Sequence, residues 1–420
     1  MKKLIKLLCV TMCAVCPLTL KAQVSSEVIS ISPSYTNQVF YSLSAGEISN
    51  VSNLDWDIAF QNRGFAASIL INSKNNVRLW KSGKSLAQWS AMMVSDTTGI
   101  LSNPSYELFN SDTSWDFGAF NRTNDPNNIF DLGWGTYDFI THAITGDSVY
   151  FIKVGATDFR KLKVESLAGG VYSFRHANLD GSNEIAATVT KSNFAGKFFA
   201  YYSLVNNTTI DREPVYNTWD LTFCQYLTLT PYTYKVTGIL ANDSVYVAKA
   251  YPVTDPYAPM PSGLQFNDEI NAIGFDWKSY DFSTNIWTIA DSLVYYVQDR
   301  SGNTWMMVFT GFDGASTGNF YFDKGPAVPT GLNENSSLQT FSIYPNPTSG
   351  AARMVIDLKE VGPVTVQLID ATGRQLLQQQ YGVSSGLQTL DLDISNLPSG
   401  IYQVLLRQND NWQITRLVRQ

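Results

Sequence analysis

The sequence predicts an all-β protein with two tandem β-rich domains followed by a small C-terminal β-sandwich. Three observations lead to this prediction. Short runs of alternating apolar and polar residues lie between turn signals rich in Gly, Pro, Asn and Asp. The composition is 44% apolar, 13% aromatic and only 15% charged over 420 residues, which is typical of a globular rather than a disordered chain. An aromatic motif also occurs twice, and only residues 86–93 suggest a helix.

The N-terminus has the features of a secretory signal peptide. Lys2, Lys3 and Lys6 precede an apolar run at 7–20, and Ala22 offers a small-residue cleavage point. The apolar run is too short for a confident membrane span. A lipoprotein would need a small residue before the modified cysteine, and Val15 stands there instead. We therefore expect residues 1–22 to be removed during secretion.

Charge and cysteine content narrow the function classes. Loss of the signal peptide lowers the number of basic residues from 29 to 25, against 36 acidic ones. This balance leaves no basic stripe and argues against nucleic acid as a partner. Cys224 is the one cysteine of the mature chain, so we expect no internal disulfide. No histidine lies near Cys224 in the sequence, and we expect a small core or surface residue rather than a nucleophile.

The last eighty residues, 341–420, contain four short runs with period-two alternation. Their apolar positions are Met354, Ile356 and Leu358; Val364, Val366 and Leu368; Leu390, Leu392 and Ile394; and Tyr402, Val404 and Leu406. Three turn motifs separate them, at 344–350, 370–374 and 397–402. Strands with one buried face between such turns predict a compact β-sandwich.

This segment resembles the C-terminal sorting domain of type IX secretion substrates. The resemblance rests on Pro345, Asn346, Pro347, Gly350, Asp370, Gly373, Arg374, Gly400, Tyr402 and Arg416. It departs from the family in using Arg416 and Arg419 where lysine is usual in the tail. The resemblance implies recognition by the type IX machinery and its sortase. It also implies a secreted or outer-membrane surface location, with release or attachment to cell-surface lipopolysaccharide.

The region between the two ends contains an imperfect repeat. Residues 40–43 lead into the motif at 54–60, and residues 200–204 lead into a similar motif at 217–223. Further along, 134–139 precedes 147–152, as 277–282 precedes 291–296. The shared order of two anchors indicates a duplication. We expect one domain at 24–197, a second at 198–323 and a linker at 324–340.

Both copies contain strand-like runs separated by turns. These runs are 67–71, 148–154, 162–166, 234–240, 245–250, 293–298 and 305–309. In the Trp-Asp motif, period-two alternation predicts Trp56, Ile58 and Phe60 on one face of a strand. Aromatic side chains at this spacing fill a core.

These aromatic motifs resemble the HmuY family of secreted or surface haem-binding proteins. The resemblance covers roughly residues 30 to 325 when both copies are included. It implies haem capture in a β domain, with two histidines as axial ligands. His142 lies near one ligand position of the family, whereas no histidine matches the other. Haem is therefore the candidate cofactor and His142 the candidate ligand.

Other chemistry has less support in the sequence. His176 aligns with no ligand, and Met92, Met93, Met306 and Met307 are alternative iron ligands or core residues. The loops at 180–184 and 311–314 suggest hairpin turns or weak calcium sites. No nucleophile elbow, zinc-protease helix or phosphate loop occurs, and we expect no enzyme activity.

Two hypotheses about function follow. The first is capture of haem or another planar or apolar ligand in a β domain. The second is a structural or adhesive surface protein whose aromatic residues only build cores.

Overall fold

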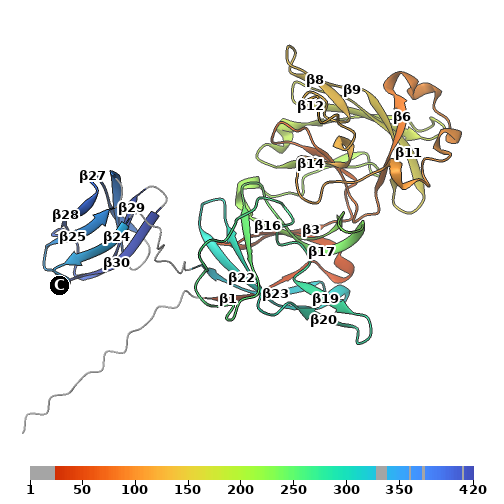
Figure 1. Cartoon of the computed structure of the whole chain (residues 1–420). Helices are drawn as coiled ribbons and strands as arrows, with labels where there is room; N and C mark the ends of the chain where they lie inside the picture. Colours follow the sequence, from red (N-terminus) through yellow and green to blue (C-terminus); the bar gives the residue numbers. More distant parts are fainter. Residues whose placement is uncertain (1–23, 328–337, 359–360, 371–373, 409–410) are drawn as a thin grey trace, which may run out of the picture. The chain divides into compact units, whose positions relative to one another are not determined.

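The computed structural model describes residues 24–327 and 338–420, apart from 359–360, 371–373 and 409–410. The chain divides into two compact units, Met1–Val328 and Pro329–Gln420. Strands dominate both units (Figure 1), which confirms the all-β prediction. The helices of the described residues are short 3-10 turns. They are η1 (Pro33–Tyr35), η2 (Leu86–Ala91), η3 (Val94–Thr97), η4 (Pro104–Tyr106), η5 (Ala119–Asn121), η6 (Lys191–Phe194), η7 (Tyr216–Thr218) and η8 (Gly314–Ser316). The predicted signal peptide, 1–22, lies outside the described residues.

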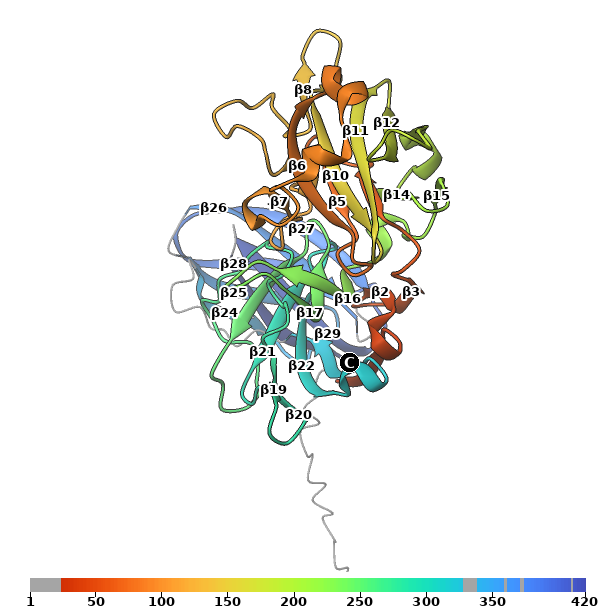
Figure 2. The same cartoon turned by 90° about the vertical axis from the view of Figure 1, so that its right-hand side faces the viewer.

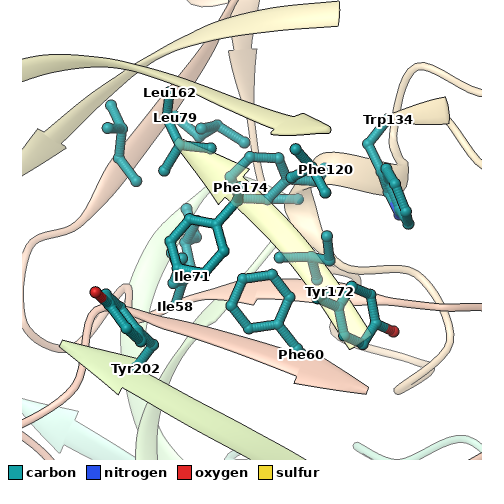
Figure 3. Close-up of a cluster of buried hydrophobic side chains, with 14 of the residues drawn as sticks. Ile58, Phe60, Ile71, Leu79, Phe120, Trp134, Leu162, Tyr172, Phe174 and Tyr202 are labelled. Carbon is teal, nitrogen blue, oxygen red and sulfur yellow. The ribbon is translucent and has the colours of Figure 1, made fainter. Parts of the chain in front are cut away.

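One lobe of the first unit is a β-sandwich built from the middle of the chain. Its larger sheet has the order β13-β12-β11-β10-β6-β7, with β8 and β9 attached, and its smaller sheet has the order β15-β14-β4-β5. The strands are β4 (Ile58–Gln61), β5 (Ile69–Ile71), β6 (Arg78–Ser85), β7 (Glu107–Leu108), β8 (Gly135–Asp138), β9 (Ala143–Gly146), β10 (Ser148–Val154), β11 (Asp158–Ala168), β12 (Val171–Asn178), β13 (Ile185–Thr190), β14 (Phe199–Ser203) and β15 (Thr208–Ile210). Figure 3 shows Phe60, Tyr172 and Phe174 side by side in its core, with the ring centre of Phe60 5.0 Å from that of Phe174. We call this sandwich the middle lobe.

The other lobe of the first unit combines both ends of that unit. Its sheets have the orders β1-β23-β22-β21-β18 and β17-β16-β2-β3, and β19 and β20 form a separate hairpin. The strands are β1 (Ser25–Ser30), β2 (Asn37–Ser42), β3 (Gly46–Ser52), β16 (Leu221–Thr228), β17 (Tyr234–Ala241), β18 (Tyr246–Ala250), β19 (Lys278–Asp281), β20 (Ile286–Ile289), β21 (Val294–Gln298), β22 (Thr304–Phe312) and β23 (Asn319–Pro326). Its core includes Trp277, which stacks on Phe309 with ring centres 3.9 Å apart. We call this sandwich the terminal lobe.

Each lobe takes strands from both copies of the sequence repeat. β2 of the first copy pairs with β16 of the second, with Tyr41 opposite Leu221. Conversely, β14 of the second copy pairs with β4 of the first, with Tyr202 opposite Ile58. Figure 2 shows β2 and β3 beside β16, apart from the group that contains β10, β11 and β14. The sequence copies 24–197 and 198–323 are thus interlocked by an exchange of strands.

The repeated Trp-Asp motif holds the exchanged strands in place. The Oδ2 atom of Asp57 accepts a hydrogen bond from the amide of Leu204 at 2.7 Å. Its counterpart, Asp220, accepts one from the amide of Leu43 at 2.8 Å. Both aspartates are buried, so each carboxylate satisfies amides that have no access to water. The motif of each copy therefore fixes the Tyr-Ser-Leu segment of the other copy.

One expectation for this motif is wrong. The sequence placed Trp56 on the same strand face as Ile58 and Phe60, but β4 begins at Ile58. Trp56 precedes the strand and packs edge-on against Tyr201, with ring centres 5.0 Å apart. It belongs to a second cluster with Ala59, on the opposite side of the sheet from the core. The alternation of buried and exposed faces does not extend to Trp56 because β4 begins only at Ile58.

The second unit is a β-sandwich, as the sequence predicts. Its sheets have the orders β24-β25-β28 and β27-β26-β29-β30. The strands are β24 (Leu338–Tyr344), β25 (Ala351–Leu358), β26 (Gly362–Ile369), β27 (Gln375–Val383), β28 (Gly386–Asp393), β29 (Gly400–Gln408) and β30 (Asn411–Arg419). Apolar side chains of both sheets, including Met354, Ile356, Val366 and Leu406, form one core. In the region expected to be a linker, Lys324 to Pro326 form the end of β23, and residues 328–337 lie outside the described part.

Candidate functional site

His142, the candidate haem ligand, closes the turn between β8 and β9. Its backbone has φ 55°, its amide donates to the carbonyl of Asp138 at 2.8 Å, and its ring Nδ1 lies 2.8 Å from the hydroxyl of Tyr137. The side chain is exposed. Non-glycine residues rarely adopt positive φ, and Asn, Asp and His tolerate it best. The local geometry therefore gives His142 a role in the turn.

The second sequence copy repeats this turn without a histidine. Asn285 has φ 58°, its amide donates to the carbonyl of Asp281 at 2.8 Å, and its side chain accepts from Tyr280 at 3.0 Å. In both turns an aspartate accepts backbone amides, and these hydrogen bonds lower the pKa of Asp138 and Asp281. For Asp281, where the hydroxyl and amide of Ser283 are the main donors, the pKa falls to about 2. His142 and Asn285 are equivalent turn residues.

His176 lies in β12, buried beside Arg160. Burial, and to a smaller extent the positive charge of Arg160, lowers the pKa of His176 to about 4. The guanidinium Nη1 of Arg160 lies 3.4 Å from the ring Nδ1 of His176.

The methionines that the sequence offers as alternative iron ligands are mostly core residues. Met306 and Met307 are buried in β22, and Met92 is buried while Met93 is exposed. The structure thus places His142 in an exposed turn and His176 inside a strand.

An aromatic cavity of about 90 Å³ lies where the two lobes of the first unit meet. The outward face of β14, in the middle lobe, contributes Phe199 and Tyr201. The outward face of β16, in the terminal lobe, contributes Cys224 and Tyr226. The aromatic lining residues are Phe40, Trp56, Trp115, Phe198, Phe199, Tyr201, Trp219 and Tyr226. The cavity reaches the surface where its lining residues Ser73, Lys74 and Gln225 are only half-buried.

Two buried ionisable residues, Arg212 and Glu213, lie beside this cavity on the connection from β15 to β16. Arg212 donates to the side chain of Gln38 at 2.9 Å and to the carbonyl of Ser52 at 2.7 Å, both in the terminal lobe. Its guanidinium lies 4.8 Å from the ring centre of Tyr201 in the middle lobe. Arg212 thereby joins the two lobes.

Glu213, the next residue, points toward the middle lobe and lines the cavity. Its carboxyl group accepts the amides of Phe198 at 2.8 Å and Phe199 at 3.1 Å, and the hydroxyl of Tyr201 at 2.9 Å. Burial raises the pKa of Glu213 to about 7, against the lowering effect of these donors and of Arg212. Glu213 therefore holds its proton up to pH values at which an exposed glutamate is charged.

Two buried hydrogen-bond donors at the cavity have no partner in the described structure. They are the indole Nε1 of Trp219 and the hydroxyl of Tyr226. The equivalent tryptophan of the first copy, Trp56, donates to Asn53 at 2.8 Å. Burial raises the pKa of the Cys224 thiol to about 12, so this thiol stays protonated and inert. Sequence reasoning missed this cavity because its residues come from segments far apart in the chain.

In the second unit, the first sorting motif is bound to the last strand. The side-chain amide of Asn346 donates to the carbonyl of Arg416 at 2.6 Å and accepts the amide of Val418 at 2.8 Å. The amide of Thr348 donates to the carbonyl of Val418 at 2.9 Å. Motifs seventy residues apart in sequence, at Asn346 and Arg416, thus form one structural element.

The other sorting motifs stabilise turns. Asp370 forms an ion pair with Arg374, in which Nε of Arg374 lies 3.1 Å from Oδ2 of Asp370. Gly373 lies outside the described residues. Gly400 begins β29, and the hydroxyl of Tyr402 donates to the carbonyl of Pro398 at 2.6 Å. Gly350 accepts the amide of Ile394 at 3.1 Å through its carbonyl. Pro345 and Pro347 flank Asn346 in the exposed turn after β24.

Metal chemistry finds no support in the part of the chain that the structure describes, where no group of three His, Cys, Asp or Glu residues could hold an ion. The carboxylate of Asp180 is used by the amide and hydroxyl of Ser182. The carboxylate of Asp313 accepts hydrogen bonds from the hydroxyls of Thr317 and Tyr321, and these bonds stabilise the turn. Among the same residues, no helix has the length and apolarity needed to cross a membrane.

Comparison with known proteins identifies the class of the second unit. Residues 342–420 match the family described as the secretion system C-terminal sorting domain. The chain therefore carries a type IX sorting domain, which makes it a secreted or cell-surface protein and implies interaction with the type IX secretion machinery. The predicted sorting domain at 341–420 is confirmed. The resemblance of 24–323 to the HmuY family stays a prediction.

Other similarities are weak. No curated protein matches the chain. Among solved structures, dimeric latent PorU from Porphyromonas gingivalis is similar at 10% identity and a TM-score of 0.17, over 66% of this chain and 26% of that chain. The BSP domain of a biofilm associated protein is similar at 11% identity and a TM-score of 0.18, over 92% and 82% of the two chains. Neither similarity supports an argument about this protein.

Proposed function

We propose that this protein is a non-enzymatic capture protein, exported by the type IX machinery, that binds a small apolar ligand between its two lobes. The aromatic cavity at the lobe interface carries this proposal. Ligand sites are mostly apolar, concave and placed between domains, with a few polar groups that orient the ligand. The cavity has these properties, and its walls come from both lobes. Several of its rings pack against one another, such as Trp56 on Tyr201 and Phe40 on Trp219, and walls that are already formed favour binding.

Haem is less favoured as the ligand of this cavity than a small apolar compound. The cavity of about 90 Å³ is well below the roughly 300–1,000 Å³ of pockets that enclose drug-sized ligands. His142 is engaged in a turn whose equivalent in the second copy uses Asn285. We therefore expect no axial ligation by His142.

A haem titration followed by absorbance tests this choice of ligand. We expect no sharp Soret shift with the wild-type protein, and the same spectrum with His142→Ala. A Soret shift that is lost in His142→Ala would establish haem capture and contradict the proposal.

Export is tested by truncation. A chain that ends before Phe341 lacks the sorting domain and should stay in the periplasm, whereas the full chain should reach the medium or the cell surface. Surface attachment to lipopolysaccharide through the sortase would add a mass increase to the protein recovered from cells. A truncated chain that still reached the surface would contradict the assigned route.

Adhesion is the second candidate function, and one observation favours it. The equivalent β8–β9 and β19–β20 hairpins present Phe139 and Phe282 to solvent, with exposed fractions of 67% and 87%. Exposed aromatic rings at two equivalent hairpin tips offer large apolar contact area to a partner surface. If adhesion is the function, Phe139→Ser combined with Phe282→Ser should lower attachment of cells without changing the fold.

A further inference from the structure

A larger groove lies between the two lobes, next to the aromatic cavity. It has a volume of about 410 Å³ and shares Ile71, Ser73 and Leu227 with that cavity. The middle lobe contributes residues from 71–78 and 104–109, and the terminal lobe contributes residues from β16, from β17 and from the loop between them. We call this space the interlobe groove. Its volume falls within the roughly 300–1,000 Å³ of pockets that enclose drug-sized ligands.

One side of the interlobe groove is apolar and open to water. Phe109 and Leu227 line the groove from the two different lobes, and both are only half-buried. Ile71 and Val77 also line it and are buried. An apolar ligand body that covered Phe109 and Leu227 would therefore remove apolar surface from water, which favours binding.

One pair of charged residues in the groove is already neutralised. The Nε and Nη2 atoms of Arg78 donate to the two carboxylate oxygens of Glu107. A bidentate pair of this kind is strong and leaves little net charge for a ligand.

Two neighbouring lysines have no such partner. The ammonium group of Lys235, which lines the groove, donates to Oδ1 of Asn76 and to the carbonyl of Lys74 at 3.3 Å. The ammonium group of Lys74 donates to the carbonyl of Ser34 at 2.7 Å. In the part of the chain that the structure describes, these acceptors are all neutral, and neither lysine forms an ion pair with a carboxylate. Burial, and then the positive charge of Lys235, lowers the pKa of Lys74, so the two cations lie close enough to repel each other.

We propose that the interlobe groove binds an amphipathic organic anion. The apolar body of this ligand covers Phe109 and Leu227, and its acidic group pairs with Lys235. Lys74 adds favourable charge at longer range. An anion at this place offsets the repulsion between the two lysines, which no carboxylate of the described chain does.

The lining also limits the kind of anion. The volume of the groove admits a body of two or three rings, or a branched chain of similar bulk. Among the described residues that line it there is no histidine, methionine or cysteine, so an iron porphyrin would find no axial ligand of these types. This site goes beyond the proposed capture of a small apolar ligand, because it is a separate space with a ligand of different chemistry.

Two dyes with the same rings test the proposal. Anilinonaphthalene sulfonate is an amphipathic anion, and its parent phenylnaphthylamine lacks the sulfonate and the charge. Both become fluorescent in apolar surroundings. Titrated into residues 24–420, the sulfonate dye should bind at a single site and more tightly than its parent. Sodium chloride should weaken only the sulfonate dye, because salt screens the attraction between partly exposed charges.

Variants assign the binding to the groove. Lys235→Gln should weaken the sulfonate dye about two- to fivefold, as expected for an exposed ion pair, and leave phenylnaphthylamine unchanged. Adding Lys74→Gln should weaken the sulfonate dye further. The matched control is Lys81→Gln, which removes the same charge at an exposed position of β6 outside the groove. Cys224→Met narrows the aromatic cavity alone, so it should leave the binding of both dyes unchanged. The unfolding midpoint of each variant shows whether it is folded.

The outcomes separate this proposal from the capture function. Equal affinity of the two dyes, with no effect of Lys235→Gln, would overturn the anionic class of ligand. An equal loss in Lys81→Gln and Lys235→Gln would overturn the role of the groove lysines. Loss of the sulfonate dye in Cys224→Met would place the dye at the aromatic cavity and overturn the groove as its site. Absence of binding of the sulfonate dye at millimolar concentration would overturn the proposal and leave capture in the aromatic cavity standing, because that cavity is too small for either dye.

Discussion

Asp57 and Asp220 show how a single side chain can specify long-range pairing. Each is buried, and each accepts the amide of a leucine from the other sequence copy. Burial raises the pKa of both carboxyl groups, while the amide donors act in the opposite direction. An alternative pairing would leave these carboxylates and amides without partners inside the protein, at a cost of about 1–3 kcal/mol each.

At the scale of single residues, the protonation of Glu213 gives the first prediction. Its pKa in the folded protein is raised from 4.5 to about 7. Between these values the folded state keeps a proton that the unfolded state has lost, so the free energy of unfolding decreases as the pH rises through this window. Relative to Glu213→Gln, the wild type should lose up to about 3 kcal/mol between about pH 4.5 and pH 8.

Urea unfolding of both proteins at several pH values measures this difference. Glu47→Gln, at an exposed position, controls for the loss of a carboxylate elsewhere. Parallel pH profiles for wild type and Glu213→Gln would show that the burial of Glu213 does not control its protonation.

At the scale of elements, the β8–β9 hairpin depends on the residue at its left-handed position. His142→Asn places in the first copy the residue that the second copy uses, and it should leave stability unchanged. His142→Val should destabilise the hairpin by about 1–2 kcal/mol, because a β-branched residue is disfavoured at φ 55°. Amide exchange of 143–146 measures the effect. Ile140→Val, in the same turn, is the control, and equal exchange in His142→Val and wild type would refute the turn role.

The sorting domain gives a second prediction at this scale. Asn346→Ala removes both hydrogen bonds from the first motif to the carbonyl of Arg416 and the amide of Val418. The end of β30 should then exchange its amide protons faster, by roughly three- to tenfold per lost hydrogen bond. We expect less protein in the medium as well, because the type IX machinery would meet a frayed tail.

Thr389→Ala, at an exposed position of β28, should change neither exchange nor export. Normal export of Asn346→Ala with faster exchange would show that the machinery does not require this connection.

Much of the local structure could be predicted from the sequence. The run predicted at 148–154 is the whole of β10, and the run at 234–240 is β17 except for one residue. Period-two alternation reports burial on one face, which each strand has regardless of its partner. The exchange of β2 and β14 could not be predicted, since either partner satisfies the same alternation. Arg212 and Glu213 were missed because nothing in the local sequence indicates that two neighbouring ionisable residues are buried.

For the whole molecule, the exchange of strands makes the first unit indivisible. Residues 24–197 lack β14 and the partner of β2, so one sequence copy leaves two sheets incomplete. We expect this fragment to be unfolded or aggregated, whereas residues 24–327 should fold as one cooperative unit.

Circular dichroism and gel filtration of the two fragments test this prediction. Mixing separately produced 24–197 and 198–327 should restore the native signal if the exchanged strands can find each other. A monomeric, cooperatively folded fragment 24–197 would contradict the prediction.

The exchange of strands between the two sequence copies also means that early strands are synthesised well before the strands with which they pair. Tyr41 on β2 must pair with Leu221, which is made 180 residues later. At about 5–20 residues per second, the earliest strands are finished roughly 9–36 s before their partners exist. During that interval an aromatic, unpaired edge is open to other chains, so the nascent protein depends on whatever keeps it apart from its neighbours until the terminal lobe closes.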